Sequence, residues 1–175
     1  MHPIEIIKVI HSPGATPHHG HLIAGRHVLT CALGRSGISR FKREGDGATP
    51  AGSFRPLEVR YRADRLQRPQ TRLPTRPIAP DDGWGDAPFD ANYNRPLRTP
   101  YPASHERMWR DDYLYDLLVV LDHNTCPRIH GRGSAVFFHL ARPDYGPTEG
   151  CIAISRTDME RLLPLLSPET ALQVG

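Results

Sequence analysis

The 175-residue sequence predicts a mainly β fold in a single domain, and three observations support this. A chain of this length is most simply one domain and buries a core without disulfide staples. Its apolar content of 38% is modest, whereas 18 prolines and 15 glycines indicate many turns and few long helices. Short runs rich in Val, Ile and Leu lie between these turns, as strands do. We therefore expect one β-rich domain over residues 1–175.

The first two strands are expected at residues 4–10 and 22–33, as a candidate hairpin around a turn rich in Pro, Gly and His. Histidine-rich tracts can bind Zn²⁺. No cysteine or carboxylate joins these histidines at a ligand spacing, so we interpret them as part of a solvated turn and predict no metal site. They are His11, His18, His19, His21 and His27.

Residues 34–52 are rich in glycine and carry Lys42 and Arg43. A phosphate-binding loop needs Gly-x-x-x-x-Gly-Lys-Ser/Thr before a helix, and this segment has neither that order nor a helical pattern after it. We predict a surface hairpin loop that does not bind nucleotide.

Residues 55–110 are rich in proline and arginine, and we predict an ordered, largely irregular insertion there. Proline alone would suggest a linker, but five aromatic side chains supply enough apolar area to pack on a core. Nucleic-acid binding is the alternative explanation for the arginines. Acidic residues alternate with them, no stacking or helix-turn-helix motif is present, and the net charge is only +3, so we expect no nucleic-acid partner. The aromatic residues are Trp84, Phe89, Tyr93, Tyr101 and Trp109.

The remaining elements are expected in the C-terminal third of the chain. Residues 113–122 form the most apolar run and predict a central strand. Ser155 and Asp158 have the spacing of a helix capping box, which predicts one short helix ending near Leu163, before a proline. A last strand is expected at residues 171–174.

Two negative features narrow the class of protein. The three cysteines, Cys31, Cys126 and Cys151, cannot all pair with one another, so no disulfide framework is implied. Residues 1–5 lack the basic start of a signal peptide, and no run approaches the ~20 apolar residues of a membrane span. We expect no membrane span. A cytosolic protein, a removed export signal and another export route all remain open.

The candidate active site lies in residues 131–154. An apolar run at 135–140 ends around His139, and a short connector with several turn residues separates it from Cys151. Such a connector places the two on neighbouring strands, where they can meet. A cysteine nucleophile needs such a base, because a free thiol with a pKa of about 8.5 is only a few per cent thiolate at pH 7. We expect His139 to ionise Cys151.

Two further residues complete this prediction. Gly150 lacks a Cβ and lets a substrate carbonyl approach, so the backbone amides of Gly150 and Cys151 are candidate oxyanion donors. His130 competes with His139 for the role of base. His139 is preferred because it ends a strand-like run, whereas His130 lies among turn residues.

The signature Gly-Ser-apolar-apolar-Phe-x-His followed by Pro-Thr-Glu-Gly-Cys, at residues 133–151, resembles the compact branch of the L,D-transpeptidase (YkuD-type) family. Three more stretches resemble the same branch, so that the similarity spans roughly residues 30–166. They are Lys42-Arg43-Glu44-Gly45-Asp46-Gly47-Ala48-Thr49-Pro50-Ala51-Gly52, Asp81-Asp82-Gly83-Trp84, and Tyr93-Asn94-Arg95 through Leu114-Tyr115-Asp116.

The resemblance implies a β-sandwich or barrel in which Cys151 forms an acyl-enzyme with a peptidoglycan stem peptide and His139 is the base. It implies no cofactor, a monomer, and a place in the cell envelope. Candidate substrate contacts are Thr148, Glu149, His123, Lys42 and Arg43.

The chain also departs from the wider family's pattern. Glu149 stands where a second histidine is usual, and Ala153 stands where Arg or Asn is usual. A carboxylate beside the thiol disfavours the thiolate unless an arginine such as Arg142 or Arg156 offsets it. Three rival functions remain open: an L,D-carboxypeptidase or amidase that uses water, a wall-binding module without catalysis, and a zinc protein with Cys151 and His139 as ligands.

Overall fold

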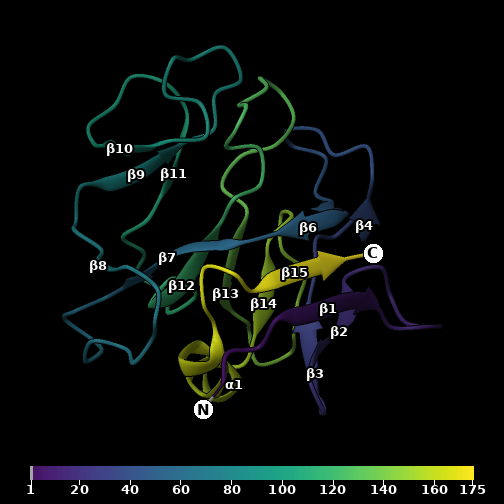
Figure 1. Cartoon of the computed structure of the whole chain (residues 1–175). Helices are drawn as coiled ribbons and strands as arrows, with labels where there is room; N and C mark the ends of the chain where they lie inside the picture. The colour runs from purple at the N-terminus through teal and green to yellow at the C-terminus, as the bar shows by residue number, and fades with distance from the viewer. Residues whose placement is uncertain (1) are drawn as a thin grey trace.

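A ten-stranded sheet organises the computed structural model, which describes residues 2–175 (Figure 1). The fold is mainly β with one short C-terminal α-helix, as predicted. In spatial order the sheet contains β6 (Gly52–Phe54), β15 (Ala171–Val174), β1 (Ile6–His11), β2 (His19–Ala24), β3 (His27–Ala32), β14 (Ile152–Ile154), β13 (Phe137–Leu140), β12 (Leu117–Leu121), β7 (Pro56–Tyr61) and β8 (Thr75–Pro77).

The sheet curls around one apolar core. Ile7 and Val9 of β1 belong to the same buried cluster as Val59 of β7 and Val119 of β12, although these strands are far apart in the sheet order. Figure 1 shows β1 and β15 crossing in front of β13 and β14. Side chains alternate along each strand, so a curled sheet turns one face inward and leaves the other for a second layer. Phe137 and Cys151 of the signature belong to a second apolar cluster on that other face.

The N-terminal region contains a hairpin that was not predicted from the sequence. The predicted strand at 22–33 is two strands, β2 and β3, joined by a two-residue turn at Gly25 and Arg26. Gly25 has a φ of +60°, a left-handed conformation that glycine adopts without a Cβ penalty. The predicted pairing of the first strand is confirmed, because β1 runs antiparallel to β2.

Residues 55–110 are more regular than predicted. β7 lies inside the main sheet, antiparallel to β12, and a second sheet is formed by β10 (Pro96–Arg98), β9 (Asp82–Gly85) and β11 (His105–Arg107). The fully buried Arg60 of β7 connects the two sheets, since its guanidinium pairs with Glu58 at 2.6 Å and lies 5.3 Å from the ring centroid of Trp84. Arg60 therefore belongs to the interior of the protein.

The loop at 34–52 is anchored more tightly than a surface hairpin. It contains a short parallel pair, β4 (Ile38–Ser39) with β5 (Thr49–Pro50), and it lies against the residues that precede β14. Gly34 forms an isolated bridge with Thr148, and its amide donates to Thr49 Oγ1 at 2.8 Å. These contacts bring Lys42 and its neighbours to the active-site signature.

The C-terminal helix follows its sequence signals. α1 (Arg156–Leu162) begins after Ser155, whose hydroxyl accepts from the Asp158 amide, so the predicted cap is confirmed. The 3₁₀ turn η1 (Leu163–Leu165) follows, and β15 completes the sheet parallel to β1. Within residues 2–175 no helix is long and apolar enough to cross a membrane.

Candidate active site

The candidate base lies on β13, and the candidate nucleophile immediately precedes the adjacent parallel strand β14. β13 pairs with β14 in a register that puts Phe138 beside Ile152 and His139 beside Ala153. Phe138 and Ile152 face the main core, so Phe137, His139 and Cys151 lie on the opposite face. The connector therefore crosses over and keeps the strand direction, where a simple reversal would have produced an antiparallel pair.

Both side chains line one cavity of about 400 Å³. Its walls come from the loop at 34–52, the insertion at 55–110 and the segments flanking β13 and β14. The polar and charged residues along it are Lys42, Glu44, Asp86, Glu106, Arg110, Tyr115, Ser134, His139, Arg142, Thr148, Glu149 and Cys151.

The Cys151 thiol is neutral at rest. Its Sγ donates to the Ala135 carbonyl at 3.2 Å and accepts from the Phe137 amide at 3.3 Å, and the residue is 9% exposed. Burial raises the pKa of the thiol to about 12, because the charged form loses its solvation. Burial thus opposes the predicted ionisation of this thiol by His139.

His139 is neutral as well, with a defined tautomer. Its Nδ1 lies 2.9 Å from the Leu140 carbonyl, which can only accept, so Nδ1 carries the proton and Nε2 keeps a lone pair. Burial lowers the pKa of this imidazole to about 4. The ring of Tyr115 meets it edge-on at 5.2 Å between centroids. A backbone carbonyl thus orients the candidate base.

One of the two predicted oxyanion donors, the Gly150 amide, is already hydrogen-bonded. The Gly150 amide already donates to Thr148 Oγ1 at 3.1 Å, and the Thr148 hydroxyl in turn donates to the Cys151 carbonyl at 2.7 Å. Thr148 therefore closes the turn that presents Cys151. A φ of +136° explains why residue 150 is glycine, since other residues rarely adopt this conformation.

Glu149 lines the cavity as an exposed, ion-paired side chain. Its side chain is 82% exposed and pairs with the Arg35 guanidinium, which also donates to the Gly45 carbonyl at 3.2 Å. The sequence pointed to Arg142 or Arg156 as the compensating cation, and the structure corrects this to Arg35. Arg35 thus neutralises Glu149 and joins its turn to the loop at 34–52.

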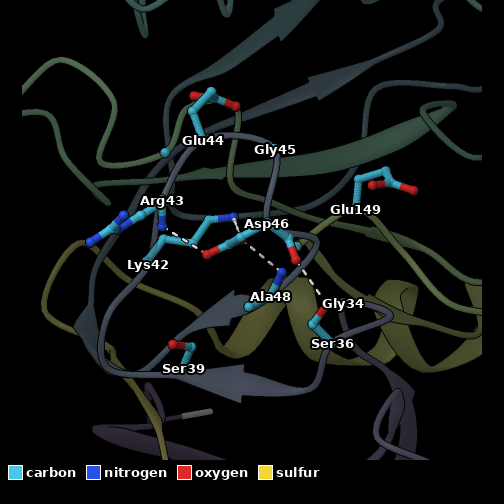
Figure 2. Close-up of polar contacts among 12 residues, drawn as sticks. Gly34, Ser36, Ser39, Lys42, Arg43, Glu44, Gly45, Asp46, Ala48 and Glu149 are labelled. Carbon is cyan, nitrogen blue, oxygen red and sulfur yellow. Dashed lines mark hydrogen bonds and ion pairs between the residues drawn. The ribbon is translucent and has the colours of Figure 1, made fainter.

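The remaining candidate site residues differ in burial and in whether they line the cavity. Lys42 is buried and lines the cavity, whereas the neighbouring Arg43 side chain is exposed and extends away from Asp46 (Figure 2). His123 lies outside the cavity lining, where its Nε2 contacts the Arg132 carbonyl at 3.0 Å. His130 is an exposed loop residue stacked on Tyr93, with its Nδ1 against the Pro88 carbonyl.

Four charged or polar residues that line the cavity were not singled out from the sequence as site residues. They lie in the insertion or just before β12, and are Asp86, Glu106, Arg110 and Tyr115. Burial raises the pKa of Glu106, although hydrogen bonds from Tyr115 and Arg110 oppose the shift. Asp86 Oδ1 is buried without a hydrogen-bond partner. For Tyr115, the family resemblance at Leu114-Tyr115-Asp116 was a sequence signal of a functional position, but it did not indicate which residues Tyr115 contacts.

Metal binding has no visible basis in the described residues. Between residues 2 and 175 no group of three or more His, Cys, Asp or Glu side chains is arranged to hold an ion. The histidines near the N-terminus make local contacts, such as Thr16 Oγ1 with His19 Nδ1 at 2.7 Å.

Among three comparisons with known proteins, the match to a family model identifies the family. No curated protein matches the chain. A solved structure, Mycobacterium tuberculosis L,D-transpeptidase 1, aligns at 13% identity with a TM-score of 0.40 and covers 97% of this chain. The chain spans 61% of the length of that structure. The family model of the L,D-transpeptidase catalytic domain, YkuD, matches residues 18–174. The chain therefore belongs to the YkuD family of L,D-transpeptidase catalytic domains.

Proposed function

We propose that the protein is a cysteine acyltransferase that acts on peptidoglycan stem peptides, with Cys151 as nucleophile and His139 as base. The main support is that His139 of β13 and Cys151, just before the adjacent strand β14, both line one cavity while Nε2 of His139 is left unprotonated. No step of this chemistry requires a cofactor.

The neutral resting pair defines the first step. Cys151 Sγ attacks the carbonyl carbon of an amide between an L- and a D-residue, and the thiol proton passes to His139 Nε2 as the S–C bond forms. The C–N bond then breaks, the leaving amine takes that proton, and a thioester remains on Cys151. An acceptor amine or water resolves the thioester, with His139 again as base.

Mass spectrometry of the protein incubated with a tetrapeptide stem tests this function. We expect an adduct on Cys151 that has lost the terminal residue of the stem, and no adduct with Cys151→Ala. Cys126→Ala is the matched control, because Cys126 is exposed and lies outside the cavity lining. An adduct that persists in Cys151→Ala contradicts the assignment. Adding a free amine then separates transfer from hydrolysis through the products released.

A further inference from the structure

Lys42 is a buried cation that the chemistry above does not use. Its side chain is 8% exposed and lines the cavity beside Gly150 and Cys151. A buried ammonium is costly unless it is paired. Among residues 2–175 its one hydrogen-bond partner is Asp46, at 2.5 Å from Nζ. A lysine ammonium has three N–H donors, so two remain for a ligand in the cavity.

Asp46 holds this ammonium in place. Its carboxylate accepts from Lys42 Nζ and from the amides of Arg43 and Ala48 at 2.7 and 2.9 Å, as Figure 2 shows. Partial burial opposes ionisation, but these hydrogen bonds lower the pKa of Asp46 below its usual value. Glu44 fixes the same loop from the other side, because its carboxylate accepts from Tyr93 and Ser134.

Two glycines of the signature make room for Lys42. A Cβ at Gly133 would lie 2.9 Å from Lys42 Cε, and a Cβ at Gly150 would lie 3.3 Å from Lys42 Nζ and 2.7 Å from the Ala48 carbonyl oxygen. The ammonium is therefore packed against the residue that precedes the nucleophile. Its charge also opposes the upward shift of the Cys151 pKa, which indicates electrostatic contact with the thiol.

We propose that Lys42 Nζ stabilises the oxyanion formed when Cys151 attacks the substrate carbonyl, and that Asp46 is its positioning residue. The S–C bond forms, the π pair of the carbonyl moves to its oxygen, and a free N–H of Lys42 donates to that oxygen until the C–N bond breaks. Thr148 already engages the Gly150 amide, and Lys42 Nζ is packed against the same glycine, so its free N–H groups are additional donors beside the Cys151 amide. This proposal rests on the proposed acyl transfer at Cys151.

The test compares three reagents on wild type and Lys42→Met. p-Nitrophenyl acetate acylates a thiol through an oxyanion and carries no carboxylate. Iodoacetamide alkylates a thiol without forming an oxyanion. A tetrapeptide stem is the proposed donor. Adducts are mapped to Cys151 by mass spectrometry, and thermal unfolding verifies that each variant is folded. Arg40→Met is the matched control, since Arg40 is an exposed cation of the same loop outside this cavity.

Lys42→Met should slow acylation by p-nitrophenyl acetate roughly 10²–10³-fold, the usual effect of removing one oxyanion donor. The rate of Cys151 alkylation by iodoacetamide should fall by less than about tenfold, the factor that corresponds to a change of one unit in the pKa of the thiol. Asp46→Asn should slow acylation less than Lys42→Met, because the cation stays but loses its anchor. Arg40→Met should match wild type in all three reactions.

Two results overturn the proposal. Equal losses with the ester and with iodoacetamide mean that Lys42 acts only on thiolate formation. A loss confined to the stem peptide means that Lys42 holds the peptide's terminal carboxylate. If the ester shows the Lys42 dependence while no stem peptide acylates wild type, the substrate class proposed above is wrong and the oxyanion role stands.

Discussion

At the scale of single residues, burial decides the protonation of the candidate catalytic pair. It raises the pKa of Cys151 to about 12 and lowers that of His139 to about 4. Neither residue is charged near pH 7, so proton transfer must accompany attack on the substrate.

The same burial predicts an acid-sensitive contribution from His139. Between about pH 6.5 and 4 the unfolded imidazole binds a proton that the folded one does not, so stability falls as the pH falls through this window. The loss attributable to His139 is about 3 kcal/mol at most. Urea unfolding at several pH values should show a shallower slope for His139→Gln than for wild type. His130→Gln, at an exposed loop histidine, is the control, and identical slopes in all three proteins contradict the prediction.

Glu149 is predicted to matter little for the first chemical step. Arg35 already neutralises its carboxylate, and an exposed ion pair typically contributes under about 1 kcal/mol. Glu149→Gln should therefore leave the single-turnover rate of Cys151 acylation within about threefold of wild type. A tenfold faster acylation would show that the carboxylate suppresses the thiolate despite Arg35.

Local residues were predictable from sequence, and residues assembled by long-range contacts were not. Cys151 and His139 lie in one short segment whose strand and turn pattern is readable, and the structure brings them to one cavity. Lys42 was named only as a substrate contact, because its place beside Gly150 depends on a fold contact across more than a hundred residues. Tyr115 and Glu106 were missed for the same reason.

At the scale of elements, the insertion at 55–110 contains regular strands that its proline-rich and arginine-rich composition did not predict. β7 alternates apolar Val59 and Tyr61 with charged Glu58 and Arg60, yet Arg60 is buried through its pairing with Glu58. In β9 a Cβ at Gly85 would overlap the Asn92 carbonyl, so this glycine permits close packing inside a strand. The irregular insertion was predicted from the proline and arginine content of this segment, which does not report on these contacts.

The helix cap is the element whose energy is easiest to test. Ser155 Oγ accepts from the Asp158 amide at 3.1 Å and donates to the Asp158 carboxylate at 2.6 Å. Ser155→Ala should lower the free energy of unfolding by about 1 kcal/mol, the usual effect of losing an N-cap. Chemical denaturation measures this, with Ser53→Ala on the exposed face of β6 as control. Equal losses in both variants would show that the cap contributes nothing specific.

At the scale of the whole molecule, the insertion holds the wall of the cavity. Asn94 Oδ1 accepts from Trp84 Nε1 at 3.0 Å and from the Ala135 amide at 3.1 Å, while Nδ2 donates to the carbonyls of His123 and Asn124. Ala135 has a φ of +50°, which costs a residue with a Cβ roughly 1–2 kcal/mol. Its carbonyl accepts the proton of the Cys151 thiol. One amide side chain of the insertion thus supports the strained residue that faces the nucleophile.

Asn94→Ala should therefore weaken the whole fold and the site together. It leaves the indole N–H of Trp84 and the Ala135 amide without their acceptor, at roughly 1–3 kcal/mol each. Urea unfolding should show one transition at a lower midpoint, and alkylation of Cys151 by iodoacetamide should become faster as Ala135 is released. Asn92→Ala is the control, because the side-chain Nδ2 of Asn92 donates to the Tyr101 hydroxyl within the insertion at 2.8 Å. This variant should leave the alkylation rate unchanged. A separate early transition in Asn94→Ala, with unchanged alkylation, would show that the insertion melts independently and does not support the cavity wall.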